Sequence, residues 1–246
     1  MYKTTIRNIV ILTYALGGLL MTAAQQAMAD NTIPTFDAVY TLTSGPFTLG
    51  ETTRRLYRNG DNHYVYESHS KPSGYAKLFT KAELHEKTTW IFADGKPRPL
   101  SYSYIRSGSK KRNRDVSLKF NWEKGQVTNI INDDPWTMDI PDDTQDKLLY
   151  HLTLMHDLQN GREDIVYNIA DGGKVKTYTF EFLGEETVST KLGKFKTVKL
   201  KQPGRKHHTL VWCAPDLNYL PIQLEHENKD GKVRMKITGL KGIEYR

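Results

Sequence analysis

Residues 116–122 read Val-Ser-Leu-Lys-Phe-Asn-Trp, and Lys124-Gly125 follows after one further residue. Apolar and polar residues alternate along this stretch, as they do in a strand with one buried face and one solvated face. A glycine at the end of a short polar segment is typical of a tight turn. The stretch therefore predicts an antiparallel hairpin.

The same pattern recurs on both sides of this hairpin. Alternating apolar residues occupy 178–182, 220–224 and 233–237, and turn signals separate such segments at fairly regular intervals. The turn signals are Asn59-Gly60-Asp61, Asp94-Gly95-Lys96, Lys124-Gly125, Asp171-Gly172-Gly173, Leu192-Gly193-Lys194 and Asp230-Gly231-Lys232. We predict a mainly β fold in which a curved antiparallel sheet forms an open or half barrel.

One segment, from about Asp143 to Asn160, changes to helical periodicity. Its apolar stripe is formed by Leu148, Leu149, Leu152, Met155 and Leu158. Asp142 or Asp143 can cap the first amides, and Gly161 can take the left-handed position after the last turn. The segment predicts one amphipathic helix packed on the sheet.

The N-terminus has the three parts of an export signal. Lys3 and Arg7 precede an apolar run from residue 9 to 21. The segment then ends in Ala27-Met28-Ala29, a small-residue cleavage site, before Asp30. The alternative is an uncleaved membrane anchor, but a run of about a dozen residues is short of the roughly 20 that a spanning helix needs. We predict a signal peptide at 1–29, cleavage between Ala29 and Asp30, and a single β-rich periplasmic domain at 30–246.

Removal of this segment lowers the formal net charge from +7 to +5, because it takes away Lys3 and Arg7. A mild positive excess favours anionic surfaces such as lipid headgroups, and nucleic acid is a poor partner for an exported protein. The basic residues gather in two clusters that could form an anion-binding rim or could simply be solvated. The clusters are Lys110, Lys111, Arg112 and Arg114, and Lys199, Lys201, Arg205, Lys206, His207 and His208.

Patterns for known chemistry are weak. The sequence contains no Gly-x-Ser-x-Gly, and Ser107-x-x-Lys110 lies in a polar segment that predicts a loop and not a helix start. Adjacent His207 and His208 would point to opposite faces of a strand. The eight histidines therefore predict no metal site, and we expect no cofactor.

The acidic and thiol groups also give little evidence of a catalytic or metal site. His151 and His156 are five residues apart on the predicted helix, too far round for one metal, and the aspartates of 133–146 fit a solvated loop with a helix cap. Glu225 and Glu227 share one strand face and could act as a carboxylate pair, although solvated charges are commoner. The single cysteine, Cys213, lies in an apolar run and predicts a buried core residue.

Aromatic residues on two predicted strands are the candidate ligand-binding residues. A curved sheet either fills its concave side with large side chains or leaves room for a ligand, so core packing is the alternative. The candidates are Tyr102, Tyr104, Tyr178, Phe180 and Phe182.

Several phrases resemble a family of secreted bacterial proteins, domain of unknown function 3108. They are Phe36-x-Ala38-x-Tyr40, Gly95-x-Pro97-x-Pro99-x-x-Tyr102, Phe120-x-Trp122, Gly193-x-Phe195 and Trp212-x-Ala214-Pro215-x-Leu217-x-Tyr219-Leu220-Pro221. The last phrase is also similar to a hairpin of periplasmic lipoprotein carriers, whose half barrel holds acyl chains. That resemblance implies a fold, and it places the helix at 143–160 as a lid or plug on the concave face.

Three functions remain open at this point. The first is a non-enzymatic binding or carrier protein for a hydrophobic or lipid-like envelope ligand. The second is an interaction protein with a filled core and basic docking loops, and the third is a hydrolase of envelope polymers.

Overall fold

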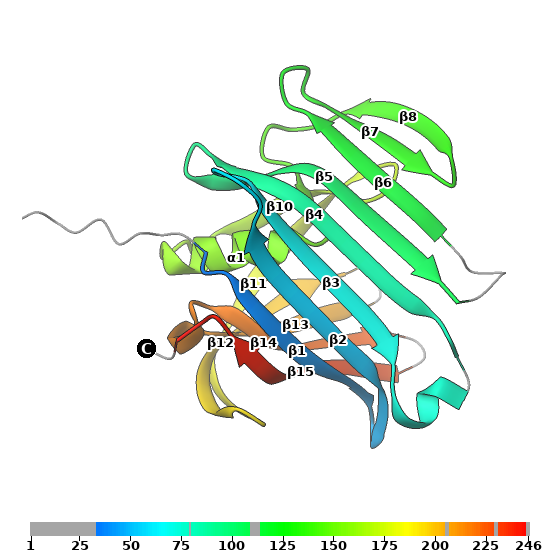
Figure 1. Ribbon diagram of the computed structural model, residues 1–246. Coiled ribbons are helices and arrows are strands. Elements are labelled where there is room, and N and C mark those ends of the chain that lie inside the picture. Colours follow the sequence, from blue (N-terminus) through cyan, green and yellow to red (C-terminus); the bar gives the residue numbers. More distant parts are fainter. Residues whose placement is uncertain (1–32, 79, 109–113, 205–206, 229–230, 245–246) are drawn as a thin grey trace, which may run out of the picture. The chain divides into compact units, whose positions relative to one another are not determined.

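The structure is a computed structural model that describes residues 33–78, 80–108, 114–204, 207–228 and 231–244 (Figure 1). The predicted signal peptide lies outside these residues, as do Lys110, Lys111, Arg112, Arg205 and Lys206. The described residues fall within one compact unit, residues 31–246.

The described part contains fifteen strands, one α-helix and two short 3₁₀ helices. The first eight strands are β1 (Phe36–Ser44), β2 (Phe47–Arg58), β3 (Tyr64–Pro72), β4 (Glu83–Ala93), β5 (Lys96–Ser107), β6 (Arg114–Asn121), β7 (Gln126–Ile131) and β8 (Asp134–Asp139). The other seven are β9 (Gln145–Asp146), β10 (Ile165–Ala170), β11 (Val175–Thr190), β12 (Gly193–Pro203), β13 (His208–Ala214), β14 (Leu220–Asn228) and β15 (Gly231–Lys241). The helices are α1 (Tyr150–Gln159), η1 (Gly74–Leu78) and η2 (Pro215–Leu217).

All fifteen strands belong to one sheet, which confirms the predicted fold class. Its order is β8-β7-β6-β5-β4-β3-β2-β1-β15-β14-β13-β12-β11-β10-β9, so β1 and β15 join the two halves of the chain. Every pairing is antiparallel except that of β9 with β10. Because β8 and β9 end the order without pairing to each other, the sheet is open and not a closed barrel.

The alternating stretch at residues 116–122 forms most of β6 and the start of its turn, as predicted. Val116 and Leu118 are buried, and β6 pairs with β7 after the turn. The turn between β4 and β5 also follows its sequence signal, because Asp94 (φ 52°) and Gly95 (φ 73°) both take the left-handed backbone that a two-residue hairpin turn requires.

Helix α1 lies on the concave side of the sheet. It contacts β5, β10 and β14. In the sheet order, β5 and β14 are six strand positions apart, about 29 Å along a flat sheet, whereas a helix is only about 10–12 Å across. The sheet must therefore curve around α1 for one helix to reach both strands.

The helix is confirmed, but its predicted start at Asp143 was wrong. It begins at Tyr150, because Gln145 and Asp146 form β9 instead and pair with Ile169 and Ala170 of β10. Neither Asp142 nor Asp143 caps it. The carboxylate of Asp146 accepts hydrogen bonds from the amides of Leu148 and Leu149, both at 2.8 Å.

Helix α1 also has no solvated face over most of its length, since residues 150–157 are all buried. One core cluster contains Leu148, Leu149, Leu152 and Met155. They pack there with buried residues of β1–β7 and with Trp212 of β13. Tyr150 and Leu154 pack into a second cluster with β10–β13, where Cys213 is fully buried as predicted. The concave side is thus largely filled by the helix.

Candidate functional site

The predicted ligand-binding aromatics do not line one cavity, because α1 lies between them. Tyr102 and Tyr104 lie on β5, where Tyr102 is buried and donates a 2.7 Å hydrogen bond to Glu86. Both tyrosines border a small hollow of about 60 Å³ that also contacts Arg114 and Lys147.

The other three aromatics lie on β11. Phe180 is buried and Tyr178 is half-buried, and both rings pack against Tyr150 of α1, with centroids 6.2 and 5.6 Å away. Phe182, two residues further along, is 62% exposed. The sequence therefore identified aromatic strand faces. Of the five residues, Tyr104 borders an open hollow of about 280 Å³ beside Leu84 and Arg106, and Phe182 borders a larger one.

That hollow is an apolar groove of about 440 Å³ at the C-terminal end of α1. It is large enough for part of a small-molecule ligand, since such sites usually measure about 300–1,000 Å³. Residues from α1, the loop that follows it, three strands and the turn before β14 form its walls. They are Leu158, Gly161, Arg162, Glu163, Ile165, Phe182, Val198, Leu200 and Tyr219.

Local chain geometry opens this groove. Gly161 (φ 68°) ends α1 in the left-handed conformation, as the sequence predicted, so the chain turns towards β10 and exposes the side of Leu158. The pairing of β11 with β12 shifts register between Phe182 and Gly184 (φ 103°), and such a bulge bends the strand where Phe182 projects.

One charged residue at the groove is held in place. Arg162 donates a 3.1 Å hydrogen bond to Asp157, which also accepts one from the Tyr167 hydroxyl at 2.8 Å. Burial alone would raise the pKa of Asp157, but hydrogen bonds from His156 and Tyr167 and the charge of Arg162 outweigh it and lower the pKa. The ionised carboxylate of Asp157 therefore holds the Arg162 guanidinium beside the apolar walls and pairs with its charge.

The basic clusters are only partly described. Arg114 is exposed at the start of β6. In the second cluster, Lys199 pairs with Glu186 at 2.8 Å and Lys201 with Glu181 at 3.5 Å. These two lysines therefore already have carboxylate partners.

The possible carboxylate pair has partners of its own. Glu225 is buried between Arg234 at 2.6 Å and Lys232 at 3.2 Å. Glu227 lies 3.9 Å from His208.

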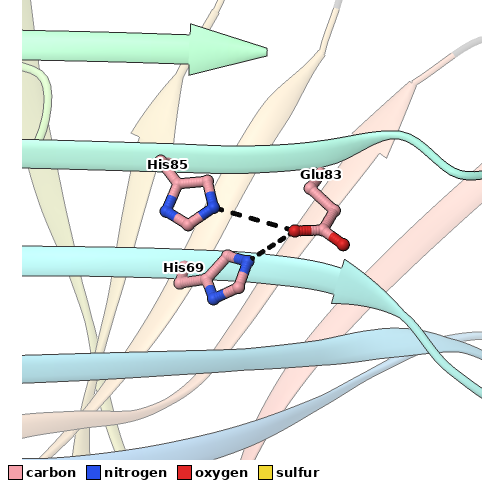
Figure 2. A group of neighbouring side chains, drawn as sticks. All are labelled: His69, Glu83 and His85. Atoms are coloured by element: carbon pink, nitrogen blue, oxygen red, sulfur yellow. Dashed lines mark hydrogen bonds and ion pairs between the residues drawn. The ribbon is translucent and has the colours of Figure 1, made fainter. Parts of the chain in front are cut away.

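Three further side chains come together on the face of β3 and β4 opposite to the buried residues Tyr66 and Ser68 (Figure 2). His69, Glu83 and His85 bring their ligand atoms within 4.8 Å of one another, and they are the one such group of potential metal ligands in the described part of the chain. The group could not be predicted from the sequence, because it depends on which residues of β3 and β4 face each other. The available signal was Glu83-x-His85, whose spacing puts both side chains on one strand face.

The fold and the groove define an open, β-barrel-like protein with a central helix. The chain belongs to the family described as protein of unknown function DUF3108, whose sequence profile matches residues 39–238. This confirms the resemblance predicted from the sequence. No curated protein matches the chain.

Two solved structures are similar. One is a β-barrel-like protein of domain of unknown function DUF1849 from Brucella abortus, with 13% identity and a TM-score of 0.55, covering 86% of this chain and 98% of that one. The other is titled a putative lipoprotein from Parabacteroides distasonis, with 9% identity and a TM-score of 0.35, covering 86% and 96%. The first likeness supports the fold. In the described residues, no helix has the length and apolar character needed to cross a membrane.

Proposed function

We propose that this protein is a non-enzymatic, exported binding or carrier protein for a hydrophobic or lipid-like ligand of the cell envelope. The observation that carries the proposal is the apolar groove at the end of α1, with Phe182 62% exposed on its wall. An exposed phenylalanine beside Leu158, Ile165 and Leu200 offers an apolar chain a surface that is otherwise hydrated.

The filled interior restricts where a ligand could bind. Because α1 packs into both core clusters, an acyl chain would bind in the groove at the helix end and not between the helix and the sheet. Of the five aromatics predicted from the sequence, Phe182 then contacts the ligand directly. Tyr178 and Phe180 lie on the same strand as Phe182, and their rings pack against Tyr150 of α1.

The test compares two exposed phenylalanines. Phe182→Asp places a charge in the groove and should weaken binding of a fluorescent fatty acid by at least about tenfold, because a buried carboxylate loses its hydration. Phe47→Asp is the matched control, since Phe47 is 70% exposed and is not among the residues that form the groove. Phe180→Asp is a poor test, because Phe180 is part of the core and its replacement would disturb folding.

Native mass spectrometry of protein purified without detergent gives an independent result. A co-purifying lipid at one per chain, lost in the Phe182→Asp protein, would support the proposal. Equal fatty-acid binding by the wild type and the Phe182→Asp protein would refute the groove as the site.

A second function is favoured by the same filled core. An envelope interaction protein needs no cavity, and α1 leaves little interior space. If the wild-type protein retains no lipid and binds no fatty acid, this second function becomes the better explanation. The hydrolase hypothesis gains no comparable support, because Glu225 is already ion-paired with Arg234 and Lys232.

A further inference from the structure

The cluster of His69, Glu83 and His85 has the composition of a transition-metal site. Two imidazoles and one carboxylate are ligands that Zn²⁺ and Cu²⁺ bind well, and three protein ligands leave a coordination position open. The Nε2 atom of His69 lies 3.0 Å from Oε2 of Glu83, and Nε2 of His85 lies 3.7 Å from the same oxygen. Both histidines therefore direct the same type of ring nitrogen to one point (Figure 2).

These distances suit a shared ion. Ligands about 2.1 Å from a tetrahedral zinc lie roughly 3.4 Å from each other, between the two observed separations. The two imidazole rings stack with centroids 3.8 Å apart and an interplanar angle of 19°. All three ligand atoms lie within 4.8 Å of one another, so rotation of the half-exposed side chains would direct them to one ion.

The sheet holds the ligands in position. His69 and His85 are directly opposite each other in the register of β3 and β4, and Glu83 is on the same strand and face as His85. Both strands are internal to the sheet, flanked by β2 and β5. Their backbones are therefore fixed on both sides, so only side-chain rotation is needed when an ion binds.

The charges around the cluster leave it free for a cation. Among the described residues, Glu83 makes ion pairs only with the two histidines, and the lysines on the same face of β3 and β4 pair with other carboxylates. Lys87 pairs with Glu67 at 3.0 Å and Lys71 with Glu51 at 3.7 Å.

We infer that His69, Glu83 and His85 form a surface site for a divalent transition-metal ion, with Zn²⁺ and Cu²⁺ as the ions that it binds best. The side chains are 37%, 44% and 52% exposed, so the ion exchanges readily with solvent. The site is separate from the groove proposed for the hydrophobic ligand, since the two share no residue.

The test uses the intact chain without a polyhistidine tag, stripped of metal with a chelator. Titration with Zn²⁺ against a chromophoric indicator should give one site per chain, and His69→Ala or His85→Ala should weaken it at least about tenfold. His208→Ala is the matched control, because His208 faces a single glutamate, Glu227, at 3.9 Å. This control should bind Zn²⁺ as the wild type does.

Thermal unfolding provides a second measurement. Zn²⁺ that binds the folded state should raise the melting temperature of the wild type and of His208→Ala, but not that of His85→Ala. Without metal, the three proteins should melt alike, because the replaced side chains are exposed. Absence of a stoichiometric site, or equal weakening by His208→Ala and His85→Ala, would overturn the inference.

Discussion

At the residue scale, Asp146 is a fully buried carboxylic acid. Its oxygens accept hydrogen bonds from Thr88 at 2.6 Å and from the amides of Leu148 and Leu149. Burial raises the pKa of Asp146 to about 6, and these hydrogen bonds offset only part of that effect. At neutral pH Asp146 is therefore ionised in the folded protein, and its buried charge is less stable there than in the unfolded chain.

This raised pKa predicts a pH dependence of stability. Between about pH 4 and 6 the folded state binds more protons at Asp146 than the unfolded state does, so this contribution to the free energy of unfolding decreases as pH rises. Relative to Asp146→Asn, the wild type should lose on the order of 2 kcal/mol between pH 4 and 7. Asparagine keeps an oxygen for the two amides and does not ionise. Urea unfolding at pH 4, 5.5 and 7 measures the difference.

Asp139→Asn is the control, because Asp139 is an exposed aspartate on the edge strand β8 and its replacement removes no buried charge. Its unfolding free energy should follow the wild-type pH profile. If the Asp146→Asn profile also runs parallel to the wild type, then Asp146 does not titrate in this range and the prediction is wrong.

At the element scale, α1 is a helix without a solvated face, and this determines what its substitutions cost. Leu152 packs towards the cluster that contains β1–β7, and Leu154 towards the cluster of β10–β13. Leu152→Ala and Leu154→Ala should each lower the free energy of unfolding by about 2–5 kcal/mol, because each leaves a cavity in a closely packed core. Denaturant unfolding monitored by far-ultraviolet circular dichroism measures both.

Leu78→Ala makes the same chemical change at a site that is 76% exposed, and should change stability by no more than about 0.5 kcal/mol. A lid helix that packs on one side only would give a different result. In that case Leu152→Ala or Leu154→Ala, but not both, would be as mild as the control.

The strands were predictable because their signals are local. Alternation along β6 and the Asp94-Gly95 turn are set by neighbouring residues, and both appear in the structure as expected. The start of α1 was not predictable, because Gln145 pairs with Ile169, 24 positions along the chain. Helical periodicity contains no information about that pairing.

The candidate sites were harder to predict, because they depend on contacts between residues that are far apart in the sequence. Phe182 was recognisable as part of an aromatic strand face, but its exposure depends on the bulge before Gly184 and on where α1 ends. The metal-ligand cluster requires His69 to face His85, a register set by the whole β3–β4 pairing. Residue types were therefore visible in the sequence, whereas their proximity was not.

At the scale of the whole molecule, the two halves of the sheet share one helix and one central pairing. Strands β1 and β15 connect the halves, and Ile237 of β15 and Tyr40 of β1 are opposite each other and fully buried. Since α1 packs into both core clusters, neither half can lose its packing without exposing apolar residues of the other. The described unit should therefore unfold in one cooperative step.

Two probes from different halves test this cooperativity. Three of the four tryptophans, Trp90, Trp122 and Trp136, lie in β4–β8 or the adjacent turn, so fluorescence reports mainly on that half. Cys213 on β13 reports on the other half, because its thiol is fully buried and burial raises its pKa, which makes it inert to thiol reagents while folded. Tryptophan emission and Cys213 labelling, followed across one urea series, should have the same midpoint. In Leu152→Ala both midpoints should shift together to lower urea; a Cys213 midpoint that stayed in place would mean that β10–β14 folds independently of the first half.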